Sequence, residues 1–212
     1  MKQITFASFK GGAGKTTAVM AVASTLVADG KRVALIDADE NTPLIDWRKA
    51  AYETATQGGF DYIITDTRGG GSELNNACLV NTDLVIIPSA LTSLDMTQAL
   101  VTFEHTIELH QTMALDVPVA LLIQRVPVGK LTVSQRQSLA ALSELPRCET
   151  ILHARDAYAA MSRQGLLYLT HDALAADMMK RFNAGHIAMA MTEARALTND
   201  LLEALGEKPE ER

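Results

Sequence analysis

The chain has 212 residues, of which 48% are hydrophobic, and a formal net charge of −6 at pH 7. A chain of this length and composition is expected to fold around one core, which excludes a disordered protein and leaves little room for a second domain. The negative charge excludes a global attraction to DNA or to anionic membranes, and the two cysteines, Cys78 and Cys148, lack the paired spacing of metal or iron–sulfur sites.

Strands and helices alternate along the first part of the chain. Residues 3–8 form a short β-prone run, and after a glycine-rich loop an apolar helix over 16–30 is expected to end with Gly30 as its cap. A second strand over 32–39 ends in carboxylates. The segment 43–56 reads as a helix with a proline near its first turn, and a third strand begins at Phe60.

The second part of the chain continues the same alternation, which predicts an α/β fold with a mainly parallel, twisted sheet and helices on both faces. We expect one domain over 1–205 and a charged tail over 206–212. The remaining predicted elements are a strand over 83–90 stopped by Pro88, a helix over 94–113, a strand over 117–126, a helix over 131–145, a short strand over 148–154 and a helix over 183–205.

The stretch FKGGAGKTT, Phe9–Thr17, nearly matches the phosphate-binding pattern G-x-x-x-x-G-K-[ST]. Backbone N–H groups that open onto a helix N-terminus can hold a phosphate, Lys15 would reach the β- and γ-phosphates, and the Thr16 hydroxyl would ligate Mg²⁺. The predicted nucleotide-binding loop therefore consists of Gly11, Gly12, Ala13, Gly14, Lys15, Thr16 and Thr17.

Carboxylates follow two of the predicted strands. Asp66 ends the apolar run YIIT and has the position of the acid that holds a magnesium-bound water, while Asp37 and Asp39 end the second strand. Ligands of parallel sheets bind beyond the carboxyl ends of the strands, where these residues and Arg68 all fall. We therefore predict one magnesium and nucleotide site, with Thr16 and Asp66 as the metal residues.

The motif KGGAGKTT, residues 10–17, resembles the deviant Walker A motif K-G-G-x-G-K-T-[ST] of the ParA/MinD ATPases at every fixed position. This resemblance implies a P-loop ATPase that uses ATP and Mg²⁺ and hydrolyses ATP slowly until a partner stimulates it. It also implies an ATP-dependent homodimer, in which Lys10 reaches across the interface to the phosphates of the partner subunit. Lys15 would serve the nucleotide of its own subunit.

The same resemblance assigns further residues. Asp39 is expected to position or activate the attacking water, and Asp37 to support the loop or the magnesium, although the chemistry alone allows these two roles to be exchanged. Gln124 and Arg125 stand where the family often has an Asn-Arg pair that contacts adenine, and a glutamine can make the same amide contact on a longer arm. The family often continues after the second strand with proline and glutamine, whereas Glu40 and Asn41 follow here.

Five longer stretches are similar to the VirC-type ParA-like ATPases of T-DNA transfer. This similarity implies a DNA-associated switch that positions a relaxase–DNA transfer complex. The five stretches are SFKGGAGKTT, DGKRVALIDADEN, DTRGGGSELNN, QRVPVGKLTVSQR and RDAYAAM.

The closing segment NDLLEALGEKPEER is acidic, unlike the basic membrane helix of MinD-like proteins.

The resemblance also implies a DNA-binding surface and a switch loop. The family binds DNA largely without sequence preference through pooled basic residues, although each such residue alone is more often a solvated surface charge. The glycine-rich loop TRGGGSELNN, residues 67–76, is either a nucleotide-dependent switch or a plain flexible loop. The candidate DNA-binding residues are Lys130, Arg136, Arg147, Arg155, Arg163, Lys180, Arg181 and Arg195.

Three other functions stay open from the sequence: a small plasmid partition ATPase, a small-molecule enzyme similar to dethiobiotin synthetase, and a module that binds ATP without cleaving it. The segment between Arg48 and Phe60 is short for the family, either naturally or because residues are missing. No signal peptide precedes the first strand and no apolar run is long enough to cross a bilayer, so we expect a cytoplasmic protein without membrane insertion.

Overall fold

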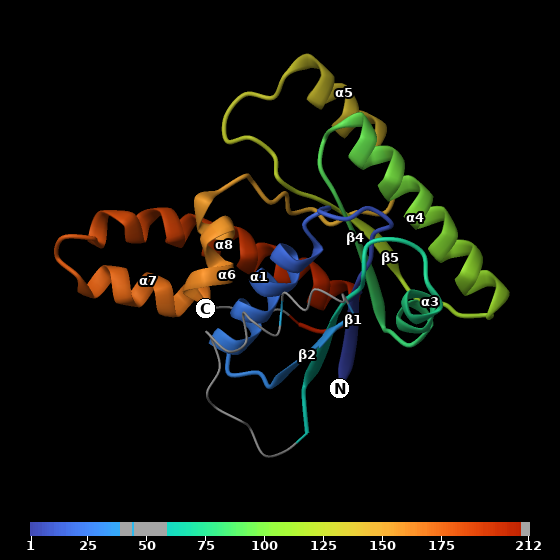
Figure 1. The fold of residues 1–212 in the computed structure, drawn as a ribbon, viewed down its shortest axis with the longest axis horizontal. Coiled ribbons are helices and arrows are strands. Elements are labelled where there is room, and N and C mark those ends of the chain that lie inside the picture. The colour runs from blue at the N-terminus through green and yellow to red at the C-terminus, as the bar shows by residue number, and fades with distance from the viewer. Residues whose placement is uncertain (39–43, 45–58, 209–212) are drawn as a thin grey trace.

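The structure is a computed structural model that describes residues 1–38, 44 and 59–208 (Figure 1). The predicted helix over 43–56, apart from Leu44, therefore lies outside the described residues, as does Asp39. Among the residues that are described, no helix is long and apolar enough to cross a membrane.

In the described part of the chain, the centre of the fold is a sheet of five strands in the order β2-β3-β1-β4-β5, and every neighbouring pair is parallel. This parallel pairing confirms the predicted fold class. Each strand is a short apolar run, and parallel strands are joined by long connections that pass over the faces of the sheet. The strands are β1 (Lys2–Phe6), β2 (Val33–Asp37), β3 (Tyr62–Asp66), β4 (Leu84–Ser89) and β5 (Val119–Ile123).

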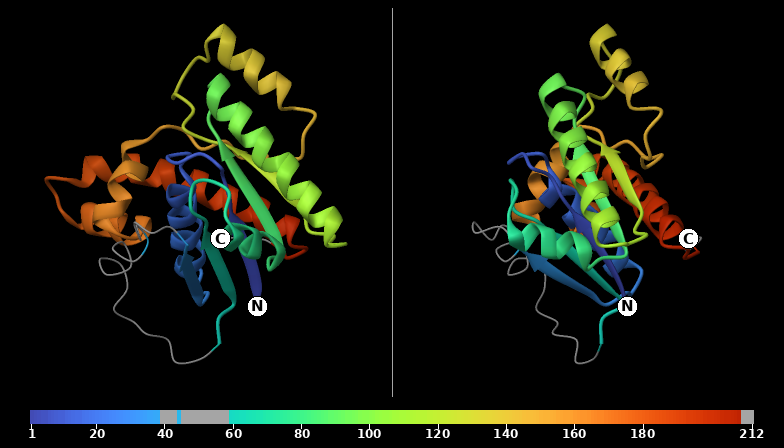
Figure 2. Two further views of the ribbon diagram at one scale, coloured as in Figure 1. Left: turned by 45° about the vertical axis from the view of Figure 1, so that its right-hand side comes forward. Right: turned by 90° about the vertical axis from the view of Figure 1, so that its right-hand side faces the viewer.

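Helices cover both faces of this sheet (Figures 1 and 2). Phe6 and Ile86 pack in the core beneath α1 and α8, whereas Val85 and Ile87 pack in the core beneath α4, because successive side chains of a strand point to opposite faces. One face carries α1 (Lys15–Ala28), α6 (Asp156–Gln164), α7 (Leu167–Ala176) and α8 (Arg181–Ala204), and the other carries α3 (Glu73–Val80), α4 (Ser93–Thr112) and α5 (Val133–Ala141).

Most predicted boundaries agree with the structure. Helix α1 ends at Ala28 with Asp29 as its C-cap, and Gly30, the predicted cap, follows directly with a φ of 75° and donates its N–H to the carbonyl of Val27. The prediction that Pro88 stops the fourth strand is wrong, because β4 continues to Ser89. Strand β1 pairs with β4 only as far as Ile86, so a proline beyond that pair removes no donor that the pairing needs.

Further differences lie in both halves of the chain. Residues 148–154 were predicted as a short strand, but they form only isolated contacts to the sheet, including a bridge between Val126 and His153. In the first half, helix α3 was also not predicted, because residues 67–76 were read as a loop, whereas the loop ends where α3 begins at Glu73. In the second half, the helices α6 and α7 were not predicted. Helices α6 and α7 are short and pack against α8 and also against α1, which lies far away in the sequence, so local patterns alone do not determine them.

Candidate nucleotide-binding site

The glycine-rich loop joins β1 to α1 at the carboxyl end of the sheet. Gly14, the N-cap of α1, has a φ of 90°, and no side chain makes a capping hydrogen bond there. Added Cβ atoms on Gly11 and Gly12 would meet no heavy atom within 4 Å, so the loop is open on that side. The first-turn N–H groups of α1 and this open loop fit a bound phosphate, and Lys15 is only 6% exposed beside them.

Gln124, at the end of β5, lies against the loop. It is 2% exposed, and its Nε2 donates a hydrogen bond to the carbonyl of Ala13. The structure therefore places this amide on the loop backbone, and the predicted contact with adenine stays a prediction. Thr17, in the first turn of α1, is half-buried.

The two residues predicted to hold magnesium are in contact. The Thr16 hydroxyl donates a hydrogen bond to Oδ2 of Asp66, whose side chain is buried at the end of β3. A hydroxyl and a carboxylate oxygen are ligands that Mg²⁺ accepts, so the donor set fits this ion. Strand pairing explains the arrangement, because Asp66 is aligned with Phe6 at the end of β1.

Asp37 holds the chain that follows β2. Its Oδ2 accepts a hydrogen bond of 2.9 Å from the backbone N–H of Leu44. This contact agrees with a supporting role for the Asp37 carboxylate in the loop. The position of Asp39 relative to the site lies outside the described residues.

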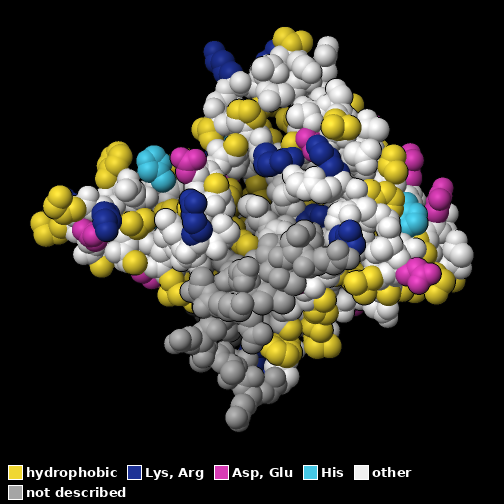
Figure 3. Space-filling view, in the orientation of Figure 1, with side chains coloured by type: hydrophobic (Ala, Val, Ile, Leu, Met, Phe, Trp, Pro, Cys, Tyr) yellow, Lys and Arg dark blue, Asp and Glu magenta, His cyan; other side chains and the backbone are white. Residues whose placement is uncertain are grey.

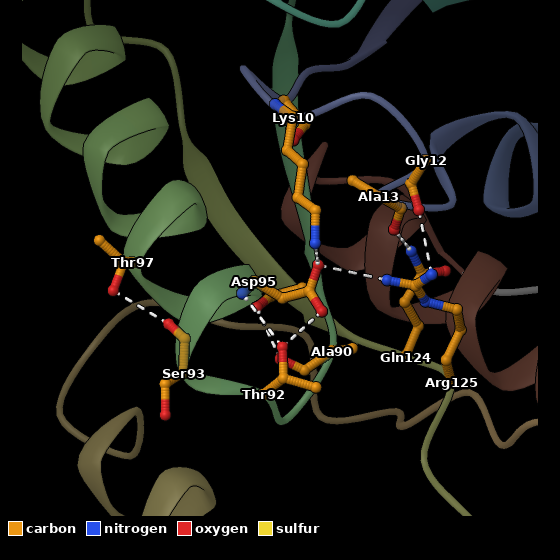
Figure 4. Close-up of polar contacts among 12 residues, drawn as sticks. Lys10, Gly12, Ala13, Ala90, Thr92, Ser93, Asp95, Thr97, Gln124 and Arg125 are labelled. Atoms are coloured by element: carbon orange, nitrogen blue, oxygen red, sulfur yellow. Dashed lines mark hydrogen bonds and ion pairs between the residues drawn. The ribbon is translucent and has the colours of Figure 1, made fainter.

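A carboxylate that the sequence did not single out, Asp95, binds two predicted site residues (Figure 4). Its Oδ1 lies 2.6 Å from Nζ of Lys10 and 3.3 Å from Nη2 of Arg125. Burial alone would raise the pKa of Asp95, but hydrogen bonds from Lys10 and Thr92 and the charge of Arg125 outweigh it and hold the pKa below its usual value. Asp95 is therefore charged at neutral pH.

Arg125 connects this carboxylate to the glycine-rich loop. Its Nη1 donates a hydrogen bond of 3.0 Å to the carbonyl of Gly12, while Nη2 contacts Asp95. Its backbone has a φ of 55°, which is unusual for a residue with a side chain. In the orientation of Figure 1, the space-filling view in Figure 3 shows several Lys and Arg side chains near the centre of the molecule.

The loop that follows β3 also touches the glycine-rich loop. A Cβ added to Gly69 would lie 2.8 Å from the backbone nitrogen of Gly11. Asn75, 3% exposed, holds the loop by donating Nδ2 hydrogen bonds to the carbonyls of Arg68, at 2.9 Å, and Gly70. The predicted switch loop thus lies beside the proposed phosphate site.

The predicted DNA-binding residues differ in their surroundings. Arg155 contacts Glu193 at 2.6 Å with both side chains 14% exposed, and Arg195 forms an ion pair with the buried Asp29. Arg147 is half-buried, and Lys180 contacts Asp177 at 3.4 Å. The exposed members are Lys130, Arg136, Arg163, Lys180 and Arg181.

Solved structures with the same fold include one bound to ATP. The chain superposes on the McdA–ATP complex from Cyanothece with a TM-score of 0.70 and 16% identity, covering 100% of this chain and 99% of that chain. It superposes on the MinC:MinD cell division complex from Aquifex aeolicus with a TM-score of 0.64 and 16% identity over the same shares. The fold is therefore that of the ParA/MinD-type P-loop ATPases.

Sequence comparison is more specific. The chain is 44% identical to protein VirC1 of Rhizobium radiobacter over 231 residues, covering 96% of this chain and 100% of the relative. That alignment is longer than the chain, so the relative has residues that this chain lacks. The VirC1 protein family matches residues 1–52 and 48–207, two ranges that meet in the segment predicted to be short. The chain therefore belongs to the VirC1 family.

Proposed function

We propose that this protein is an ATP-dependent, dimerising switch ATPase that associates with DNA and positions a relaxase–DNA complex in T-DNA or conjugative transfer. Membership of the VirC1 family supports the transfer role. The fold shared with a McdA–ATP complex and with MinD supports a nucleotide-dependent switch. We expect the protein to act in the cytoplasm.

The residues of the site suggest how the chain holds nucleotide. The open loop over 11–14 and the N-terminus of α1 would bind phosphate through backbone N–H groups, with Lys15 supplying a positive charge. Thr16 and Asp66 would hold Mg²⁺, which, when bound, neutralises charge on the phosphates. Gln124 and Arg125 fix the loop from the side of β5, and we expect the base to lie close to them.

The observation that carries the proposal is the different placement of the two lysines. Lys15 is buried at the start of α1, whereas the ammonium group of Lys10 binds a carboxylate of α4, a separate helix. Of these two lysines, Lys15 is the one that lies buried at the phosphate-binding end of α1, while Lys10 is held by a different helix. We propose that Lys10 contacts the phosphates of a partner subunit, so that ATP joins two copies of the chain.

The hydrolytic step needs a residue that orients water, and we propose Asp39 for this role. Asp37 would hold the following segment in place through its hydrogen bond to Leu44. The loop over 67–72 lies against Gly11 and would respond to the loss of the γ-phosphate. We expect slow hydrolysis that a partner protein accelerates.

DNA contact would come from the exposed basic residues of both subunits. We propose Lys130, Arg136, Arg163 and Arg181 for this surface. The other predicted residues are less available, because Arg155, Lys180 and Arg195 contact carboxylates and Arg147 is half-buried. Contacts with phosphates alone give little sequence preference and a strong dependence on salt.

The proposal is tested by measuring phosphate release and DNA binding with Mg-ATP, Mg-ADP and no nucleotide, for the wild type and for Lys15→Ala. Slow ATP hydrolysis, together with DNA binding that requires ATP and Lys15, supports the proposal. Turnover that depends on a small acceptor molecule would favour the synthetase-like enzyme. ATP binding without hydrolysis, at any DNA concentration, would favour a binding module.

A further inference from the structure

Asp95 is the residue through which the structure suggests a control on dimer formation. We propose that Asp95 is a positioning residue that retains Lys10 within its own subunit and releases it when a second nucleotide-bound subunit approaches. The proposal rests on the proposed function, in which Lys10 acts across the dimer interface.

The geometry shows a specific ion pair rather than a chance surface contact. Asp95 belongs to the first turn of α4, its side chain is 8% exposed, and its Oδ1 lies 2.6 Å from Nζ of Lys10. Its other oxygen, Oδ2, accepts a hydrogen bond of 2.6 Å from the Thr92 hydroxyl (Figure 4). The positive end of the α4 dipole also favours a carboxylate in this place. Both oxygens of Asp95 thus have partners, and Oδ1 holds the ammonium group of Lys10.

Release of Lys10 would be costly if it left a buried charge without a counterion. Arg125 removes this obstacle, because its Nη2 lies 3.3 Å from the same Oδ1. The guanidinium is also anchored to the carbonyl of Gly12, so it stays near Asp95 when Lys10 leaves. Asp95 therefore has two cations in the isolated subunit and needs only one of them.

Competition between anions decides where Lys10 lies. In the isolated subunit Asp95 is the carboxylate nearest to Lys10 that the described contacts show, while the phosphates of a partner subunit would offer several negative charges. The exchange of Asp95 for phosphates would therefore occur only on encounter with a loaded partner. Without the Asp95 charge, Lys10 breaks no ion pair within its own subunit when the dimer forms, so the dimer should form more readily.

The test compares Asp95→Asn with the wild type by sedimentation, using Mg²⁺ and a non-hydrolysable ATP analogue at saturation. We expect the dimer of Asp95→Asn to dissociate at about tenfold lower protein concentration, corresponding to about 1.4 kcal/mol. Asp61→Asn is the matched control, because Asp61 also binds an arginine, Arg32 at 2.8 Å, but lies at the opposite end of β3. It should leave dimerisation unchanged.

An unchanged or weaker dimer for a folded Asp95→Asn variant would overturn the inference while leaving the proposed function intact. A wild type that stays monomeric with the ATP analogue would overturn both. If Asp95→Asn does not fold, acetylation of the nucleotide-free wild type gives the answer. Lys10 should then react several-fold more slowly than the exposed Lys130, and equal rates would contradict the ion pair.

Discussion

Gly14 and Gln124 are in contact so close that no side chain fits between them. A Cβ built on Gly14 would lie 2.4 Å from Nε2 of Gln124 and 3.0 Å from its Cδ. The same amide donates to the carbonyl of Ala13, so Gln124 supports the loop, and a larger residue at position 14 would have to displace this side chain. The glycine is required by its neighbour as well as by its φ of 90°.

We predict that Gly14→Ala lowers the free energy of unfolding by about 2 kcal/mol or more, because the left-handed conformation and the contact with Gln124 both oppose a side chain. Gly11→Ala is the control, since an added Cβ there meets no atom within 4 Å, and it should change stability by less than about 0.5 kcal/mol. Urea unfolding of the two variants without nucleotide checks the prediction. Equal stabilities would contradict the described contact.

The contact between Thr16 and Asp66 predicts a magnesium effect. Mg²⁺ should raise the affinity for nucleotide, and in Thr16→Ala this gain should be at least about tenfold smaller, equivalent to about 1.4 kcal/mol. The reason is that the substitution removes one of the two proposed oxygen ligands. Thr16→Ser keeps the hydroxyl and should retain most of the effect. Titration calorimetry with and without Mg²⁺ measures it, and an unchanged magnesium dependence in Thr16→Ala would exclude the threonine as a ligand.

Glu193 predicts a dependence of stability on pH. Burial alone would raise its pKa, but hydrogen bonds from Arg155 and His153 outweigh burial and lower the pKa below the ordinary value of 4.5. The carboxylate therefore stabilises the fold above about pH 4.5, and this contribution is lost as the pH falls through the lower pKa of the folded state. Glu193→Gln should accordingly lose most stability at pH 7 and much less at low pH.

The measurement is urea unfolding of the wild type and of Glu193→Gln at pH 7 and pH 3. Asp172→Asn serves as control, because Asp172 has a side chain that is 72% exposed and pairs with its direct neighbour His171. A difference between wild type and Glu193→Gln that is the same at both pH values would show that the charge of Glu193 contributes nothing.

The basic residues divide into two groups with different predicted effects. Lys130→Ala and Arg136→Ala should weaken DNA binding and make the slope of log affinity against log salt shallower by about one for each phosphate contact. Arg155→Ala should lower stability, because it leaves the carboxylate of Glu193 with fewer partners, yet should keep the salt slope. If Arg155→Ala changed the salt slope while Lys130→Ala and Arg136→Ala did not, Arg155 would be the DNA contact and the other two would not.

The sequence predicted those parts of the fold that local patterns determine. The run YIIT before Asp66, the glycines of the loop and the glycine after α1 are local signals. The structure places the first two as expected, and Gly30 follows the C-cap, Asp29, in a left-handed conformation. Pro88 was misread because its tolerance depends on where the pairing with β1 ends. Helices α6 and α7 were missed because their burial depends on α1 and α8.

The candidate site shows the same limit. That Thr16 and Asp66 lie at one site was predicted, since the motif and the strand end both point to one edge of the sheet, and the structure adds the hydrogen bond between them. Asp95 was not, because it lies 85 residues from Lys10 in an ordinary capping sequence of α4. Nothing near Asp95 in the sequence indicates that its carboxylate faces the glycine-rich loop.

The most direct test of the central claim is the molar mass of the protein in solution with Mg-ATP analogue, with Mg-ADP and without nucleotide, for the wild type and for Lys10→Ala. The proposed switch predicts a wild-type dimer with the ATP analogue only, and a monomer for Lys10→Ala in all three conditions. A wild-type monomer in every condition, or a dimer that forms equally well without Lys10, would contradict it.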